Sequence, residues 1–277
     1  MAIFGVLNYN GKSSDDFDLT LCSVDSNVDE IPMGLSREVL KGENTMNRPI
    51  ANHYGAKYSD TLTFDVTFVK NNQKDFSHDE IREINAWLTS TKMPTLLYID
   101  DEEENETVYH FGIFTAVTNV YTSGITALTY TFTSNAPYGW SKEYMMKYNC
   151  SGNITFVLND GSDDLEDFVY PFIFIKGTKG TNITISNLSE NEEFSITLPC
   201  DQLYINSKYH QIYRYYADKK VIVSLADLGW SEETQESIAD GTKSIYWIRL
   251  LPGENKISVS GACEITFTYR VPVKAVY

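Results

Sequence analysis

The sequence predicts a mainly β protein made of two domains, each with its own core. Strand-favouring aromatic residues are abundant, with 19 Tyr and 14 Phe. Much of the chain alternates apolar and polar residues, the pattern of a half-buried strand. The length of 277 residues exceeds the usual size of one domain, and the style of the sequence changes near residue 140.

Three segments of the first half have the clearest strand pattern. In segment 61–68, Leu62, Phe64, Val66 and Phe68 share one face. Segment 108–117 is expected to place Tyr109, Phe111, Ile113 and Val117 on one face. Segment 128–133 does the same with Leu128, Tyr130 and Phe132, and the YTSG turn at 121–124 joins these last two segments.

One segment of the first half follows the helical period instead. Ser77 precedes Glu80 by three residues, the spacing of a capping box. Apolar residues then recur at helical spacing: Ile81, Ile84 and Leu88, with Trp87 beside them. We therefore predict an amphipathic helix over 77–90, ending before Pro94.

The second half reads as many short strands separated by polar turns, with almost no helix. A link of mixed character, 141–152, leads into it. The predicted strands are 153–158, 170–177, 182–187, 193–199, 203–206, 212–216, 221–225, 245–250, 255–261 and 264–271. This pattern is typical of a β-sandwich or jelly roll.

The stretch SNAPYGW at 134–140 marks the boundary between the domains. Pro137 cannot donate a hydrogen bond to a strand ladder, so it ends the preceding strand. We expect Tyr138 and Trp140 to cover the end of the first core. The predicted domains are 1–140 and 141–277.

Charge and hydropathy exclude several classes of partner. The 22 basic residues are outnumbered by 38 acidic ones, which gives a formal charge of −16, and no basic stripe is present to bind nucleic acid. No run of about 18 apolar residues predicts a membrane span, and the amino terminus has no charged leader. The chain is expected to be soluble and made in the cytoplasm.

Metal, cofactor and redox chemistry find little support in the sequence. The four cysteines, Cys22, Cys150, Cys200 and Cys263, lie far apart and are expected to be reduced core residues, with disulfides as the lesser alternative. The four histidines, His53, His78, His110 and His210, lack the spacing of metal ligands. The sequence therefore predicts no metal and no cofactor.

Several stretches, in this order, resemble the distal tail protein (Dit) family of long-tailed phages of Gram-positive bacteria. In the first half they are NGKSSDDFDL at 10–19, NRPIANHYGAKYSDTLTFDVTF at 47–68, the helix with Trp87, MPTLLYIDDEEENETVYHFGIF and YTFTSNAPYGWS. In the second half, YPFIFIKGTKGTNITISN and LLPGENKISVSGACEITFTYR resemble the carboxy-terminal domain of the family, a galectin-like β-sandwich. The resemblance covers nearly the whole chain.

The resemblance implies a structural role in the virion. The amino-terminal domain, a sandwich or barrel-like fold with one helix, is expected to form a hexameric ring, with a hairpin extension that embraces the neighbouring subunit. The ring would sit at the tail tip, between the tail tube protein and the tail-associated lysin or hub, and would hold receptor-binding proteins. The carboxy-terminal sandwich would lie outside the ring.

Two acidic stretches raise other chemistries. The stretch DDEEENE at 100–106 has enough carboxylates for calcium, but not the spacing of an EF-hand, so we interpret it as a solvated hairpin tip. The loop DGSDDLED at 160–167 suggests a glycosidase pair, and ordinary loop chemistry explains it as well. No nucleophile motif accompanies either stretch, so no catalytic residue is predicted.

One aromatic group stays open as a contact site for a saccharide or a protein partner. Its members are Tyr209, Tyr213, Tyr215, Tyr216, Tyr246 and Trp247. Such rings stack on sugars, but core packing and protein interfaces use them too. Three hypotheses therefore stand: a structural hub of the virion, a module that binds cell-wall saccharide, and a hydrolase, of which the hub is preferred.

Overall fold

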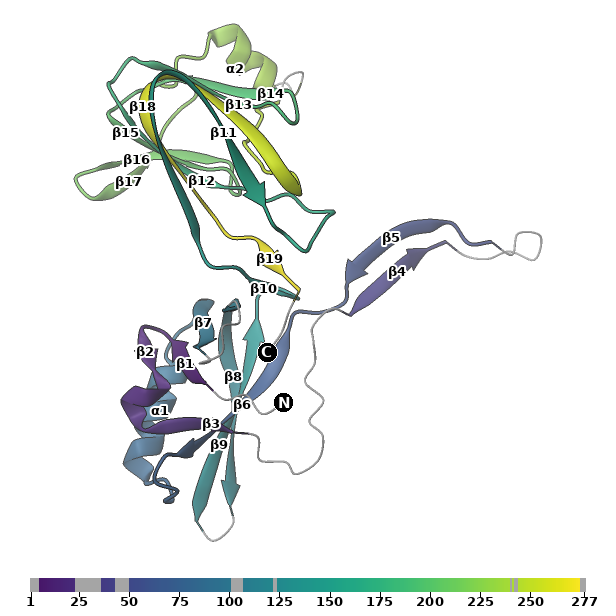
Figure 1. Cartoon of the computed structure of the whole chain (residues 1–277), viewed down its shortest axis with the longest axis vertical. Coiled ribbons are helices and arrows are strands. Elements are labelled where there is room, and N and C mark those ends of the chain that lie inside the picture. Colours follow the sequence, from purple (N-terminus) through teal and green to yellow (C-terminus); the bar gives the residue numbers. More distant parts are fainter. Residues whose placement is uncertain are drawn as a thin grey trace. The chain divides into compact units, whose positions relative to one another are not determined.

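A computed structural model describes residues 5–22, 36–42, 50–100, 107–121, 124–239, 241 and 244–274. The chain forms two compact units (Figure 1). The first comprises Met1–Lys142 and Pro272–Tyr277, and the second comprises Glu143–Val271. Each unit has its own apolar core. The predicted mainly β, two-domain fold is confirmed.

The first unit is built on an antiparallel sheet whose main path runs β2-β1-β7-β8-β9-β6-β3. The strands are β1 (Val6–Tyr9), β2 (Lys12–Ser13), β3 (Leu19–Cys22), β6 (Thr63–Lys70), β7 (Thr95–Asp100), β8 (Tyr109–Tyr121) and β9 (Ile125–Ser134), with a short 3-10 helix at Ser14–Phe17. Leu62, Phe64, Val66, Phe68, Leu128, Tyr130 and Phe132 are buried, as predicted. Strands of the predicted period therefore supply most of this core.

Strand β8 lies with the opposite face inward from the one predicted. Val108, His110 and Phe114 are buried, whereas Val117 is 45% exposed. The register places His110 opposite Leu97 of β7 and Phe114 opposite Phe132 of β9, and both partners are buried, so this face of β8 belongs to the core. Tyr109, Phe111 and Ile113 lie on the opposite, half-buried face. The bulge between Phe114 and Ala116 puts Val117 opposite Tyr130, so the four residues do not share one face as predicted.

Helix α1 (His78–Thr89) confirms the predicted helix. The Ser77 hydroxyl accepts from the Glu80 N–H, and the Glu80 carboxylate accepts from the Ser77 N–H at 2.8 Å, which completes the capping box. Ile84, Trp87 and Leu88 are buried in the core of the sheet, with Ile81 packed at its edge. Helix α1 is thus held by its cap and by its apolar face.

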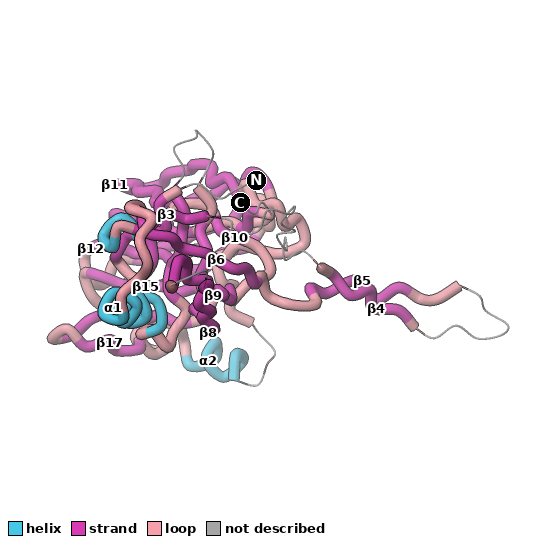
Figure 2. The backbone as a smooth tube through the Cα atoms, turned by 90° about the horizontal axis from the view of Figure 1, so that it is seen from below, coloured by secondary structure: helices cyan, strands magenta, loops and turns pink. Residues whose placement is uncertain are grey.

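A separate hairpin belongs to the first unit. Strand β4 (Arg37–Lys41) pairs with β5 (His53–Tyr58) in a two-stranded sheet of their own. Almost all of its side chains are exposed, including Val39 and Tyr54. Figures 1 and 2 both show the hairpin extending away from the sheet of this unit.

The boundary stretch SNAPYGW ends in a short strand. After Pro137, β10 (Gly139–Trp140) pairs with β8 and with β19 (Pro272–Val273), a strand from the far end of the chain. The Tyr138 ring contacts the rings of Tyr58 and Trp140 edge-on. Residues 272–274 therefore return to the first unit, which differs from the expected division into 1–140 and 141–277.

The second unit is an antiparallel β structure with the main path β14-β13-β18-β12-β15-β16-β17, and β11 pairs with β18. The strands are β11 (Tyr144–Asp160), β12 (Phe172–Gly177), β13 (Asn182–Asn187), β14 (Glu192–Thr197), β15 (Gln202–Asn206), β16 (Gln211–Tyr216), β17 (Lys219–Ile222) and β18 (Gly253–Tyr269). Isoleucines from β12, β13, β15 and β18 dominate its core.

Three expectations for the second unit were wrong. The link 141–152 is largely the first half of β11, and segments 255–261 and 264–271 lie mostly in one strand, β18. The long pairing of β11 with β18 carries both strands past Gly152 and Gly261, which face each other. Segment 245–250 is not a strand: only Leu250 forms a bridge, to Val169. A short helix, α2 (Glu232–Ala239), was not predicted.

Some expectations fall outside the described residues. The acidic tip at 100–106 is described only at Asp100, and residues 122 and 123 of the predicted YTSG turn are likewise outside. Among the described helices, none is both long and apolar enough to cross a membrane.

Candidate interaction surface

A row of aromatic side chains crosses three neighbouring strands of the second unit, β12, β15 and β16. Strand pairing places Phe174 of β12 opposite Tyr204 of β15, and Tyr204 opposite Tyr213 of β16. Tyr213 in turn lies opposite Ile222 of β17. Side chains on directly paired residues share one face of a sheet. The row exists because these strands place isoleucine or leucine on the core face and aromatic residues on the other.

The rings of this row contact one another closely. Tyr204 stacks on Tyr213 with 5.4 Å between ring centroids and lies 5.0 Å from Phe174. Tyr215 meets Tyr204 edge-on at 5.3 Å, and Phe172 adds a further contact with Tyr213 at 6.4 Å. We call this group, Phe172, Phe174, Tyr204, Tyr213 and Tyr215, the tyrosine face. Its mutual packing orders the rings before any ligand arrives.

The tyrosine face is apolar at its centre and open at one side. Tyr213 is 8% exposed, whereas Tyr215 is 54% exposed. The ammonium of Lys220 lies 4.1 Å above the Tyr213 ring. Burial, with smaller contributions from Tyr215 and Tyr204, raises the pKa of the Tyr213 hydroxyl, which therefore stays neutral near pH 7. The surface offers stacking area, hydroxyl groups and one cation, but no acid–base pair.

The structure separates the six aromatic residues selected from the sequence. Tyr213 and Tyr215 belong to the tyrosine face. Tyr209 and Tyr216 are exposed, at 66% and 74%, and their rings do not pack against that face.

Tyr246 and Trp247 lie in other surroundings. The Tyr246 hydroxyl donates to the carboxylate of Glu190 at 2.6 Å, and Arg249 also binds this carboxylate. Trp247 stacks on His210 at 5.0 Å. The six residues therefore do not form one site.

Sequence reasoning missed Phe172, Phe174 and Tyr204. The signal was present, because segment 170–177 alternates phenylalanine with isoleucine and so has two apolar faces. One apolar face is enough to build a core, so a second one on the same strand points to an additional surface.

The acidic loop at 160–167 holds some of its carboxylates inside the fold and others, such as Asp163, at the surface. Asp160 and Asp164 are buried, at 2% and 7% exposure. The Asp160 carboxylate accepts from the Ser162 N–H at 2.9 Å, and burial raises its pKa to about 6. The two best-formed pockets of the described chain are lined by residues of the first unit and not by this loop. Within the described part of the chain, no group of three or more His, Cys, Asp or Glu residues is placed to bind a metal.

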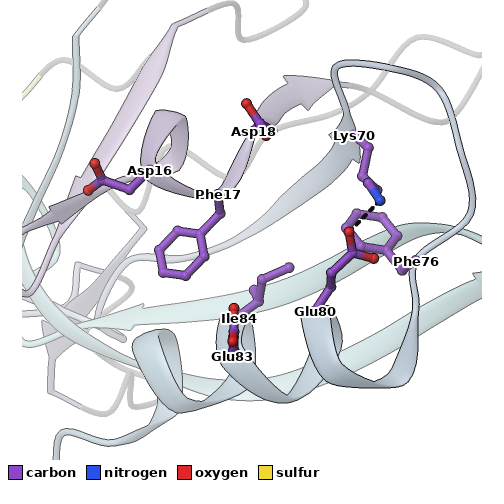
Figure 3. Close-up of a pocket in the computed structure, with 8 residues that line it drawn as sticks. All are labelled: Asp16, Phe17, Asp18, Lys70, Phe76, Glu80, Glu83 and Ile84. Atoms are coloured by element: carbon purple, nitrogen blue, oxygen red, sulfur yellow. Dashed lines mark hydrogen bonds and ion pairs between the residues drawn. The ribbon is translucent and has the colours of Figure 1, made fainter.

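A small acidic pocket lies in the first unit, beside α1 (Figure 3). It has a volume of about 210 Å³ and is lined by Asp16, Phe17, Asp18, Lys70, Phe76, Glu80, Glu83 and Ile84. Lys70 forms an ion pair with Glu80 at 2.5 Å. Hydrogen bonds from Lys70 and Ser77 hold the pKa of Glu80 at about 2. Glu80 is thus committed to the helix cap and to the ion pair, which leaves it unsuited to proton transfer.

Comparison with known proteins gives consistent matches for both units. Residues 5–136 match a family model described as a phage tail protein N-terminal domain, and residues 138–269 match one described as a phage tail C-terminal domain. No curated protein sequence matches the chain significantly.

Three similar solved structures are phage proteins. The Dit protein of phage SPP1, described as a paradigm of the hub adsorption apparatus in phages that infect Gram-positive bacteria, matches with a TM-score of 0.61 and 12% identity, over 97% of this chain and 99% of that one. A chain of the phage P2 baseplate, in its activated conformation with Ca, matches with a TM-score of 0.57 and 10% identity, over 99% and 100% of the two chains. A chain of the same baseplate with Sr matches with a TM-score of 0.57 and 11% identity, over the full length of both chains. At these identities the likeness establishes the fold.

Proposed function

Because the chain belongs to a family of phage tail proteins, whose two domain models its units match in order, we propose that it is a structural hub of the phage tail tip of the distal tail (Dit) type. The observation that carries this proposal is the full-length match of both units, in order, to the SPP1 Dit protein. A hub needs surfaces for several partners rather than a reaction centre. The chain offers a separate hairpin, two compact units and an aromatic face.

The first unit is the proposed ring-forming part, in a homo-hexamer that stacks between the tail tube protein and the tail-associated lysin or hub. Hairpin β4–β5 supports this role, since it is paired only with itself among the described strands and exposes Val39 and Tyr54. A two-stranded hairpin is marginally stable alone in water. Packing against a neighbouring subunit would stabilise it.

The second unit is the proposed outer part, a galectin-like sandwich that takes part in holding receptor-binding proteins. The tyrosine face supports a protein partner because aromatic residues are enriched at such interfaces. Its central rings are largely buried and Tyr215 beside them is exposed, an arrangement typical of the binding residues at the centre of a protein interface.

Binding of host cell-wall saccharide is the second candidate, and it rests on the same face. The exposed Tyr215 ring has the apolar surface on which a sugar ring stacks, and the nearby Lys220 ammonium would suit an anionic wall polymer. Host adhesion would then be direct. The two candidates predict different ligands for one surface.

We assign no enzymatic activity and place the protein in the virion, assembled in the host cytoplasm. Asp160 and Asp164 are buried in a loop and Glu80 is used by a helix cap, so these carboxylates lack the arrangement of an acid–base pair. Incubation with peptidoglycan and teichoic acid fragments is expected to release no product. Turnover that Asp164→Asn abolishes would contradict this assignment.

The central test is the mass of the full-length protein in solution, together with negative-stain imaging. Rings of six chains are expected. A hairpin variant, Val39→Asp with Tyr54→Asp, should dissociate them, while Val157→Asp, an exposed apolar residue of the second unit, serves as the matched control. A monomer at all concentrations, or equal loss of rings in both variants, would contradict the proposal.

A further inference from the structure

Two cysteines face each other across neighbouring strands of the second unit. Cys150 of β11 lies directly opposite Cys263 of β18, within a register that runs unbroken from Tyr144 opposite Tyr269 to Asp160 opposite Gly253. Both thiols are free, and both side chains face the core, with 6% and 8% exposure. Directly opposed residues of antiparallel strands have Cα atoms about 4.5 to 5.5 Å apart, within the range that disulfides span.

We propose that Cys150 and Cys263 are a redox-sensitive pair, which closes to a cross-strand disulfide when the protein meets a disulfide oxidant. The proposal concerns the chemistry of this strand pair alone. Oxidation of these two thiols does not depend on the proposed hub function.

In the folded protein the two thiols react slowly with an oxidant, but local opening of the sheet exposes them. The Cys150 thiol donates weakly to the main-chain oxygens of Gly152 and Val259, at 3.2 and 3.4 Å. Burial raises the pKa of the Cys263 thiol to about 11, with a smaller contribution from Cys150, so its reactive thiolate is scarce near neutral pH. Within the described sheet, β11 pairs only with β18, so β11 is an edge strand whose local opening admits an oxidant.

The chemistry is two successive thiol–disulfide exchanges. The Cys150 thiolate attacks one sulfur of oxidised glutathione, which forms a mixed disulfide and expels one glutathione thiolate. The Cys263 thiolate then attacks the Cys150 sulfur and expels the second glutathione. Two protein thiols lose their protons, two glutathione molecules are released as thiols, and the protein loses two hydrogen atoms.

The disulfide would link β11 to β18, the longest strand pair of the second unit, close to a pair of opposed glycines. Gly152 and Gly261 oppose each other two residues from the cysteines, and glycine loses the most backbone freedom on folding. A disulfide here would close a loop that contains most of the second unit, which restricts the unfolded chain. The oxidised unit should therefore resist unfolding better than the reduced one.

The experiment uses the full-length chain with Cys22→Ser and Cys200→Ser, so that the only thiols left are those of the pair. The matched control adds Cys150→Ala. Both proteins are incubated with oxidised glutathione at pH 8, denatured, treated with iodoacetamide and weighed intact by mass spectrometry. Calorimetry then follows the second unit before and after oxidation.

The pair-containing protein is expected to lose about 2 Da, in keeping with the exchange chemistry above, and to take up no iodoacetamide. Its second unit should melt several degrees higher until a thiol reductant is added, whereas the control should still be alkylated at Cys263 or retain one glutathione. Full alkylation of both cysteines after oxidation, or glutathione held on both, would overturn the proposal. So would a disulfide that forms only after the protein is unfolded first.

Discussion

The indole N–H of Trp87 donates to the main-chain oxygen of Tyr9 at 2.8 Å, and this bond ties α1 to β1. The same indole stacks on Phe17 of the 3-10 helix, with 4.7 Å between ring centroids. The Trp87 side chain thus connects α1 to both β1 and the 3-10 helix. The stability of the first unit should therefore depend on the apolar face of α1.

We expect Ile84→Ala to destabilise the first unit by about 2 to 5 kcal/mol, because the side chain is fully buried and its removal leaves a cavity. Ile81→Ala, on the same helix but only half-buried, is the matched control and should cost clearly less. Calorimetry that resolves the transition of the first unit makes the comparison. A change in melting temperature too small to resolve for Ile84→Ala would mean that α1 is peripheral to the core.

The first unit should lose stability in acid through His110. Neither ring nitrogen of this buried side chain has a hydrogen-bond partner among the described residues, and burial lowers its pKa from 6.5 to about 4. Between these two pH values the unfolded chain binds a proton that the folded chain does not. Stability therefore falls as pH drops from about 6.5 to 4, by up to about 3 kcal/mol.

His110→Phe should remove this acid sensitivity. The neighbouring Phe64 ring, 5.7 Å away, accepts an aromatic replacement of similar size, and the substitution eliminates the two unpaired nitrogens. His78→Phe, on the exposed side of α1, is the control. Melting temperatures of the first unit, measured between about pH 4 and 8, test the prediction. It fails if the melting temperature of His110→Phe falls with pH as steeply as that of the unsubstituted protein.

The second unit should respond to pH in the opposite direction through Asp160. Burial raises its folded pKa to about 6 from 3.8, so the folded state binds the proton more tightly. The stability that this proton contributes is present below pH 4 and is lost as pH rises to about 6. Asp160→Asn should flatten the profile of the second unit, with exposed Asp163→Asn as control. An unchanged profile would show that Asp160 does not titrate in this range.

Substitution at the tyrosine face should weaken partner binding. Tyr215→Ala removes an exposed ring that contacts Tyr204, whereas Tyr216→Ala removes its more exposed neighbour and serves as the control. We expect about a tenfold or greater loss of affinity for the receptor-binding protein with the first variant only. A selective loss of cell-wall saccharide binding would instead favour the second candidate function, and no difference between the variants would exclude this face.

A fragment ending at Lys142 should still assemble into rings, because the first unit has its own core and carries the hairpin. It lacks β19, which forms only a short pairing with β10. With a formal charge of −16 on each full chain, assembly of the full-length protein should improve at higher salt, which screens repulsion. Sedimentation of both proteins tests this. A monomeric fragment beside an oligomeric 143–271 would reverse the roles of the two units.

Local patterns in the sequence were sufficient wherever a single element carries its own signal. The capping box of Ser77 and Glu80 and the alternation of Leu128, Tyr130 and Phe132 depend on residues close in the chain, and both were predicted correctly. The same holds for the mainly β fold class.

Only the tertiary structure decided which side chains are buried or meet when this depends on pairing between strands far apart in the chain. His110 of β8 is buried because the register with β7 places it opposite Leu97, on the core face of the sheet, and no local pattern in the sequence reports this register. The tyrosine face forms only when β12, β15 and β16 align in register, and Cys150 meets Cys263 only through the pairing of β11 with β18. The sequence determined which side chains each strand presents, and long-range pairing determined which of them meet, because register is set by the packing of the whole sheet.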